Sequence, residues 1–166
     1  SNVQISIRLL RKLCANSQLY QWLDKGLSSD DWVVRYQTPQ RYLDAEKDAL
    51  LLRPDITIAC RRAGSETPIE MIVDAKYKNP ISEKNTRLSE SDVYQMLAYA
   101  VRYQCNRLFL VYPVFRANKY FHNPLATYLI HNGDQEIRIS ALHIDIASED
   151  LDQIQKEFIK LICHYF

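Results

Sequence analysis

Two short apolar segments, residues 52–59 and 69–78, limit the possible folds of this chain more than any other feature. Both are rich in β-branched residues and are bounded by Pro, Gly, Ser and Thr, which is typical of β-strands. Alternation along the second segment places Asp74 and Lys76 on the same side of the strand. If the two strands pair as a hairpin, Asp55 lies beside Asp74. Two carboxylates and one ammonium then meet at one end of a sheet.

Such a group of charges favours a divalent cation and hydrolytic chemistry. Two neighbouring carboxylates repel each other unless a cation lies between them. Carboxylate oxygens suit Mg²⁺ or Mn²⁺, which keep several waters and complete their ligand shell with substrate phosphate. A lysine beside the metal can hold or deprotonate an attacking water and can offset negative charge. Taken alone, however, an Asp-x-Lys sequence is more often a solvent-facing pair on a strand.

The order of these residues resembles a known family. Pro54-Asp55 followed by Asp74-Ala75-Lys76 resembles the signature of the PD-(D/E)xK nuclease superfamily. The resemblance implies an α/β fold with a restriction-endonuclease-like mixed β-sheet core flanked by helices.

Two later motifs narrow the resemblance. The segment 91–100, in which Gln95 and Tyr99 are one helical turn apart, resembles the Q-x-x-x-Y helix of RecB-like nucleases. With residues 110–113 included, the ordered motifs are most similar to the nuclease domain of McrC. McrC is the cleaving subunit of McrBC-type modification-dependent restriction systems. The resemblance covers residues 50–115.

The resemblance also implies roles for individual residues in the hydrolysis of DNA phosphodiester bonds. The metal ligands would be the carboxylates of Asp55 and Asp74 and the backbone carbonyl of Ala75, and the metal would be Mg²⁺ or, alternatively, Mn²⁺. Lys76 would orient or activate the attacking water, so that Asp55, Asp74 and Lys76 are the candidate catalytic residues. The expected supporting or DNA-contacting residues are Gln95, Tyr99 and Lys78. A solvated helix face is the alternative interpretation of the Gln95 and Tyr99 pair.

A partner follows from the same resemblance. McrC-type subunits cut DNA only when they are assembled with a GTP-hydrolysing AAA+ motor that recognises methylated DNA. The present chain has no G-x-x-x-x-G-K-[ST] loop, which is the phosphate-binding motif of such motors. We therefore expect DNA and a separate McrB-like AAA+ subunit as partners.

Length and composition indicate one globular domain of a cytoplasmic protein. The 166 residues are 47% hydrophobic and 25% charged, and we expect 1–166 to be a single nuclease domain excised from a longer chain. No run of 18 or more apolar residues occurs, so no membrane span is expected.

The four cysteines form no C-x-x-C pair, which favours free, mostly buried thiols over a zinc site. The net charge of +1 leaves nucleic-acid binding open, although basic residues cluster near the proposed site: Lys76, Lys78, Lys84 and Arg87.

Patterns along the rest of the chain predict the other elements. Helical periodicity covers residues 3–25, with Gly26 as a stop, and a strand is expected at 32–37, followed by a short continuation at 41–43. The apolar run 107–114 predicts a strand parallel to 69–78. Asn132-Gly133 predicts a hairpin between strands 127–131 and 136–140. A terminal helix capped by Ser148 would turn five residues inward: Leu151, Ile154, Phe158, Leu161 and Ile162.

A capping box at Ser89 predicts a helix that ends near Gln104. Its expected core face is Val93, Leu97, Ala100 and Val101, and its expected polar face is Asp92, Gln95, Tyr99 and Arg102. If this helix packs on the sheet beside Asp74, the polar face can turn towards the site.

Two other functions remain open. Many nucleases of the superfamily carry a Glu metal ligand on the first helix, whereas the first acidic residue here is Asp24. That departure favours a non-cleaving assembly module with a nuclease fold. The other alternative is a RecB-like nuclease that acts in defence or repair outside any McrBC complex.

Overall fold

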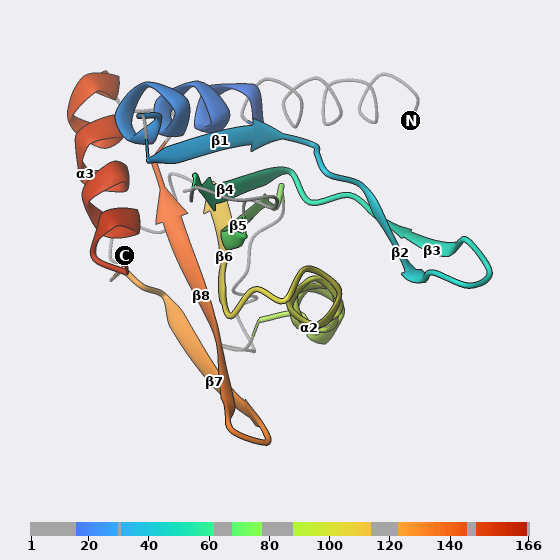
Figure 1. Ribbon diagram of the computed structural model, residues 1–166. Helices are drawn as coiled ribbons and strands as arrows, with labels where there is room; N and C mark the ends of the chain where they lie inside the picture. The colour runs from blue at the N-terminus through green and yellow to red at the C-terminus, as the bar shows by residue number, and fades with distance from the viewer. Residues whose placement is uncertain are drawn as a thin grey trace, which may run out of the picture.

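A six-stranded mixed sheet forms the centre of the protein (Figure 1). The computed structural model describes residues 16–29, 31–61, 68–77, 88–113, 123–145 and 149–165. The strand order is β1-β4-β5-β6-β8-β7. The strands of this sheet are β1 (Trp32–Tyr36), β4 (Ile56–Cys60), β5 (Ile69–Ala75), β6 (Arg107–Pro113), β7 (Ala126–Asn132) and β8 (Gln135–Ile144). The helices are α2 (Glu90–Tyr103), α3 (Leu151–Cys163) and the N-terminal helix, which covers residues 16–27 of the described chain.

The pairing of the strands confirms the predicted fold class. β4 and β5 are antiparallel, as a hairpin requires, and β6 runs parallel to β5 after the crossover through α2. β7 and β8 form the predicted hairpin, with Gly133 in its turn at a φ of 61°. Such a positive φ suits glycine because it has no Cβ. The protein therefore has an α/β, restriction-endonuclease-like fold with a C-terminal hairpin and a terminal helix.

Apolar side chains cover both faces of the sheet. Figure 1 shows the N-terminal helix and α3 on one side of the sheet and α2 on the other. On the first side, Leu23, Phe158 and Ile162 pack with strand residues such as Val73. On the second side, α2 contributes Met96 and other residues to a separate apolar cluster. Helices on both faces explain why the central strand β6 is apolar along most of its length.

The N-terminal helix differs from its prediction at one end. Leu19 and Trp22 are buried, as their periodicity predicts. Gly26 does not stop the helix, which continues to residue 27. A Cβ at Gly26 would overlap the Ile159 side chain of α3, so glycine permits the close approach of the two helices. The predicted apolar positions 3–14 lie outside the described residues.

Residues 41–52 form a separate hairpin, which the sequence analysis did not predict. β2 (Arg41–Asp44) and β3 (Ala49–Leu52) pair with each other and with no strand of the main sheet. Figure 1 shows this hairpin projecting to the side. It is tied to α2, because Arg102 Nε donates to the Tyr42 carbonyl at 2.6 Å and Arg41 donates to the Arg102 carbonyl at 3.3 Å. These long-range contacts are not visible in local sequence patterns.

Predictions at helix ends and in the first motif strands also need correction. The N-cap of α3 is Asp150, whose side chain accepts from the Gln153 amide at 3.0 Å, whereas Ser148 lies outside the described residues. Leu151 is exposed and not turned inward. Ser89 is the N-cap of α2 but makes no capping bond with its side chain. Arg53, Pro54 and Asp55 precede β4 and are not part of it.

Two predictions from composition can be compared with the described residues. Cys60, Cys105 and Cys163 are free thiols, but Cys105 alone among these three is buried, and Cys14 lies outside the described chain. None of the helices that the structure describes is long and apolar enough to cross a membrane.

Candidate active site

The two acidic residues of the signature meet where β4 begins and β5 ends. Ile56 pairs with Val73 across the two strands, so that Asp55 and Asp74 are the next residues on each side. Asp55 Oδ2 accepts a hydrogen bond from the Ala75 backbone amide at 2.9 Å. Asp55 and Asp74 are only 7% and 4% exposed. The hairpin geometry therefore holds two nearly buried carboxylates at one end of the sheet.

Lys76 completes this cluster. Its Nζ lies 2.5 Å from Asp74 Oδ2 and 2.5 Å from Gln95 Oε1. Its backbone amide donates to the Val111 carbonyl of β6 at 2.8 Å, which continues the β5–β6 pairing beyond the end of β5. The Lys76 side chain is only 13% exposed, so two polar partners and the backbone fix the position of its ammonium group.

Gln95 and Tyr99 of α2 extend the hydrogen bonds away from Lys76. Gln95 Nε2 donates to the Tyr99 hydroxyl at 2.9 Å, and that hydroxyl donates to the Arg53 carbonyl at 3.0 Å. Burial, and then the nearby charge of Asp74, raise the pKa of Tyr99 above its ordinary value. The hydroxyl is therefore protonated at neutral pH and can donate. One chain of hydrogen bonds thus runs from the end of β5 to the segment before Asp55, and its members are Lys76, Gln95, Tyr99 and Arg53.

The predicted core face of α2 is wrong in part. The buried residues of the helix are Asp92, Met96, Tyr99, Ala100 and Tyr103, whereas Val101 is 61% exposed. The helix turns much of its polar face towards the sheet, as the sequence analysis allowed. This orientation is possible because polar side chains on that face of α2 form hydrogen bonds with residues of the sheet and of the segment before β4. A buried polar group that forms a hydrogen bond avoids most of the free-energy cost of its burial.

One pair of polar residues near the site received no role from the sequence. The Tyr112 hydroxyl of β6 donates to Asp92 Oδ2 of α2 at 2.9 Å, and both residues are buried. Burial raises the pKa of Tyr112, and so does the neighbouring Asp92 carboxylate. The pair joins the first turn of α2 to β6, one turn before Gln95. The sequence does contain a sign of this pair, because Tyr112 lies in an otherwise apolar central strand. The hydroxyl group of a buried tyrosine usually forms a hydrogen bond, so a polar partner could have been expected.

Several predicted features lie outside the described residues or have no counterpart within them. Lys78, Lys84 and Arg87 are not described. Across the described ranges, no group of three or more His, Cys, Asp or Glu residues could hold a metal ion. The described residues therefore offer at most a pair of acidic ligands at this place, and Asp55 and Asp74 are that candidate pair.

Comparison with protein families decides the relationship of the chain. A family model described as "McrBC 5-methylcytosine restriction system component" matches residues 17–113, which is more than half of the sequence. The chain belongs to this family. No curated protein matches it. The match includes the candidate site, from Asp55 to Tyr112, and it confirms the resemblance to a McrBC-type system, with which the PD-(D/E)xK superfamily is consistent.

A solved structure supports the fold of this McrBC family member. It is entitled a refined half-complex from a tetradecameric assembly of Thermococcus gammatolerans McrB AAA+ hexamers with bound McrC. One of its chains is similar with a TM-score of 0.62 and 14% sequence identity. The similarity covers 88% of the present chain and 31% of the other. The present chain thus spans about a third of the length of the chain that it matches.

Proposed function

We propose that this McrBC family domain is a metal-dependent endonuclease that hydrolyses DNA phosphodiester bonds in a McrBC-type restriction system. The observation that carries the proposal is the convergence of Asp55, Asp74 and Lys76. Two almost buried carboxylates lie at adjacent strand ends, and the ammonium group is 2.5 Å from one of them. Burying two acids at adjacent strand ends is costly unless cations compensate them, and Lys76 supplies one such charge beside Asp74.

The chemistry of these donors fits Mg²⁺ or Mn²⁺. Such ions need only one or two protein carboxylates, since waters and substrate phosphate supply the remaining ligands. Asp55, Asp74 and the carbonyl of Ala75 would hold the ion. When bound, the ion supplies Lewis-acid stabilisation of the charge that develops on the phosphate and lowers the pKa of its water.

Lys76 has the position of a residue that handles water and charge. Asp74 and Gln95 hold its ammonium group in one place, so that its third N–H can donate a hydrogen bond either to an attacking water or to a phosphate oxygen. In hydrolysis, the water oxygen bonds to phosphorus, and the bond from phosphorus to one sugar oxygen breaks. The leaving oxygen takes up a proton. A fixed positive charge beside the phosphate lowers the barrier to this displacement.

Gln95 and Tyr99 act as positioning residues in this proposal. Gln95 orients Lys76, and Tyr99 fixes both the Gln95 amide and the Arg53 carbonyl two residues before Asp55. We assign Lys78 to DNA contact because of its place in the sequence beside the cluster.

We also propose that the domain acts with an AAA+ motor on a separate chain. The similar solved assembly contains McrB AAA+ hexamers with bound McrC. The 166 residues contain no G-x-x-x-x-G-K-[ST] loop, so this domain does not itself supply the motor activity in the proposal.

A plasmid-cleavage assay tests the function. The protein is incubated with methylated plasmid and Mg²⁺ or Mn²⁺, with and without a McrB-type motor. We expect cleavage by the wild type and its loss in Asp74→Ala and Lys76→Ala. Asp31→Ala and Lys25→Ala remove the same charges at exposed positions and should cleave like the wild type. Equal cleavage by all five proteins would exclude the proposed site.

Calorimetric titration with Mn²⁺ provides a second readout that does not depend on activity. The wild type should bind the ion, and Asp74→Ala should not. A folded protein that neither binds Mn²⁺ nor cleaves would instead be a non-cleaving assembly module. That alternative is favoured by the lack of a third acidic ligand among the described residues. The family match favours a McrBC role over a RecB-like nuclease acting outside such a system.

A further inference from the structure

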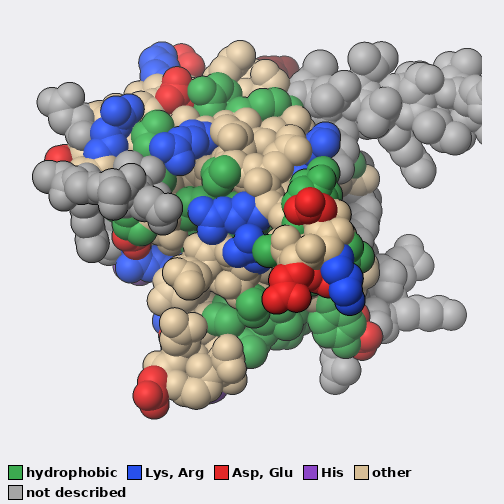
Figure 2. Space-filling view, turned by 45° about the vertical axis from the view of Figure 1, so that its right-hand side comes forward, with side chains coloured by type: hydrophobic (Ala, Val, Ile, Leu, Met, Phe, Trp, Pro, Cys, Tyr) green, Lys and Arg blue, Asp and Glu red, His purple; other side chains and the backbone are tan. Residues whose placement is uncertain are grey.

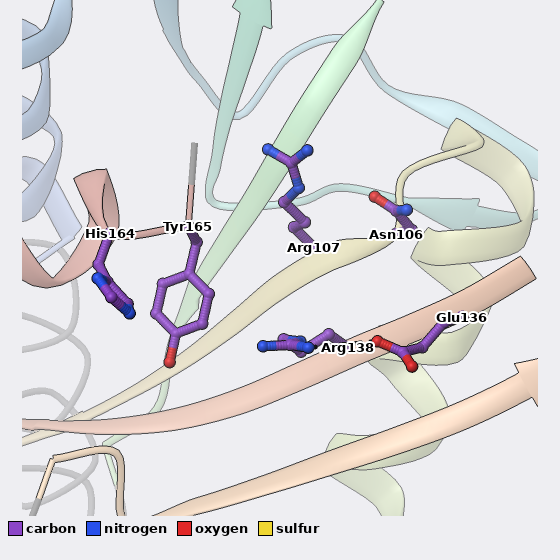
Figure 3. A pocket seen from close by; sticks show the side chains of 6 residues that line it. All are labelled: Asn106, Arg107, Glu136, Arg138, His164 and Tyr165. Atoms are coloured by element: carbon purple, nitrogen blue, oxygen red, sulfur yellow. Dashed lines mark hydrogen bonds and ion pairs between the residues drawn. The ribbon is translucent and has the colours of Figure 1, made fainter.

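A polar pocket lies where β6 and β8 begin, and none of its residues belongs to the candidate active site. Its volume is about 300 Å³. Figure 3 shows it between the end of α3 and the paired strands β6 and β8. The residues that line it are Asn106, Arg107, Glu136, Arg138, His164 and Tyr165.

Two arginines line this pocket from neighbouring strands, and Figure 3 shows that their side chains point in different directions. Arg107 and Arg138 are directly paired across the parallel strands β6 and β8. Like charges at paired positions of a sheet repel each other unless something of opposite charge lies nearby. Glu136 offsets one of them, because its carboxylate lies 3.3 Å from the Arg138 guanidinium. Within the described residues, the Arg107 guanidinium forms no ion pair. The pocket therefore has a net positive charge and a place for an anion.

The pocket has an aromatic wall as well as positive charge. The Arg138 guanidinium lies over the Tyr165 ring, 5.9 Å from its centroid. Tyr165 also packs edge-on against Phe109 at 5.1 Å between ring centroids, so the ring is fixed by the core beneath α3. Figure 2 shows several Lys and Arg side chains near the middle of one face of the molecule, with Asp and Glu side chains beside them.

The pocket is separate from the candidate active site in two ways. Arg107 lies four residues before Val111, whose carbonyl binds the Lys76 amide, and this is roughly 13 Å along an extended strand. Arg107 and Phe109 are two residues apart on β6 and therefore lie on the same face of the sheet, the face that packs against α3. Asp74 is paired with Leu110, which belongs to the apolar cluster on the other face, beneath α2. The two sites lie on opposite faces and at opposite ends of the parallel strands.

We propose that this pocket binds the phosphate group of a nucleotide or of a nucleic-acid strand. A guanidinium group binds phosphate through paired hydrogen bonds, and Arg107 can supply such a group, while Arg138 adds a second positive charge to the pocket. The Tyr165 ring and the Asn106 amide supply a stacking surface and a polar contact for the attached sugar or base. A volume of about 300 Å³ matches the small end of ligand pockets. A carboxylate is less suited, since Glu136 already supplies one to Arg138.

Nuclear magnetic resonance of the arginine side chains tests the proposal directly. The protein is titrated with 2′-deoxyadenosine 5′-monophosphate and with a single-stranded DNA dodecamer in low salt and EDTA. The Nε–Hε signals of Arg107 and Arg138 should shift with both probes. Arg107→Gln should weaken mononucleotide binding by about ten- to a hundredfold. Arg61→Gln removes an exposed arginine outside the pocket and should bind like the wild type.

The two probes separate the two sources of phosphate. Equal affinity for the mononucleotide and the dodecamer identifies a nucleotide site, whereas much tighter dodecamer binding that is lost in Arg107→Gln identifies a strand-binding site. Unshifted arginine signals with both probes, or an Arg107→Gln variant that binds like the wild type, would overturn the proposal. So would tighter binding of an acidic peptide than of either probe. Because EDTA excludes cleavage, this result is independent of the nuclease assay.

Discussion

The two faces of the central sheet differ in what they bury. The α3 face, which packs against the N-terminal helix and α3, buries mainly apolar side chains, including Val73 and Phe158. The α2 face buries Asp74, Asp92 and the hydroxyl groups of Tyr99 and Tyr112 among its apolar residues. A buried polar side chain must be held by partners, and partners fix its position. The comparison suggests that the first face mainly supplies stability, apart from the polar pocket where β6 and β8 begin, and that the second face also supplies the proposed hydrolytic chemistry.

The largest effect on stability is expected on the α3 face. Phe158 is 1% exposed and packs near Trp22, with 6.5 Å between the ring centroids. Phe158→Ala should lower the free energy of unfolding by about 3–5 kcal/mol because it leaves a cavity. Urea denaturation measures this change. The milder Phe158→Leu should remain folded and cleave DNA like the wild type, and a specific loss of cleavage in this variant would place function on the α3 face.

Substitutions at two adjacent residues of β5, Val73 and Asp74, allow the closest comparison of the two faces, because the two side chains point to opposite sides of the sheet. Asp74→Asn should reduce cleavage at least about 100-fold, since it removes a charge from the proposed metal site. Val73→Ala, on the opposite face, should cost about 2 kcal/mol of stability and leave cleavage unchanged at temperatures where the protein is folded. Cleavage rates and denaturation curves for both variants check the prediction. A reversed pattern would contradict the division between the faces.

Two tyrosines of α2, Tyr99 and Tyr103, distinguish a role in cleavage from a purely structural role on the α2 face. The Tyr103 hydroxyl donates to the Pro39 carbonyl at 2.7 Å, whereas the Tyr99 hydroxyl connects Gln95 with Arg53. Tyr99→Phe and Tyr103→Phe should each cost about 1 kcal/mol of stability. Only Tyr99→Phe should also lower cleavage, by about 10- to 100-fold, because its hydroxyl orients the residue that holds Lys76. If both variants cleave equally, Tyr99 has a structural role alone.

The smallest effect concerns pH. His143 is 3% exposed and pairs with Tyr112 across β6 and β8. Burial lowers the pKa of His143 below its ordinary value of 6.5. The unfolded chain therefore binds this proton at a higher pH than the folded protein does. The stability contributed by neutral His143 should be complete above pH 6.5 and should fall as the pH decreases further. Denaturation at several pH values should show this decrease in the wild type and less of it in His143→Asn, and equal pH dependence would refute it.

Local patterns in the sequence predicted those elements whose cause is local. The alternation in 69–78 and the apolar run 107–114 predicted the parallel pair at the centre, which the structure has at Ile69–Ala75 and Arg107–Pro113, and Asn132-Gly133 predicted the last hairpin. The order of the two motif strands was enough to bring Asp55 next to Asp74. These features depend on the periodicity of strands and on turn geometry.

The orientation of α2 could not be predicted in the same way. The amphipathic rule places polar side chains in solvent, but here Tyr99 and Asp92 have partners 46 and 20 residues away in the sequence. The separate hairpin of β2 and β3 also depends on distant contacts, with α2. The hydrogen bond from the Ala75 amide to Asp55 is likewise visible only once both strands are in place.

The most direct test of the metal site is diffraction from crystals soaked in Mn²⁺, with data recorded at the manganese absorption edge. An anomalous peak should appear within about 2.6 Å of a carboxylate oxygen from both Asp55 and Asp74, and it should be absent from Asp74→Asn crystals. A peak elsewhere in the protein, or none at saturating Mn²⁺, would contradict the assignment of these two acids as the metal ligands of a nuclease.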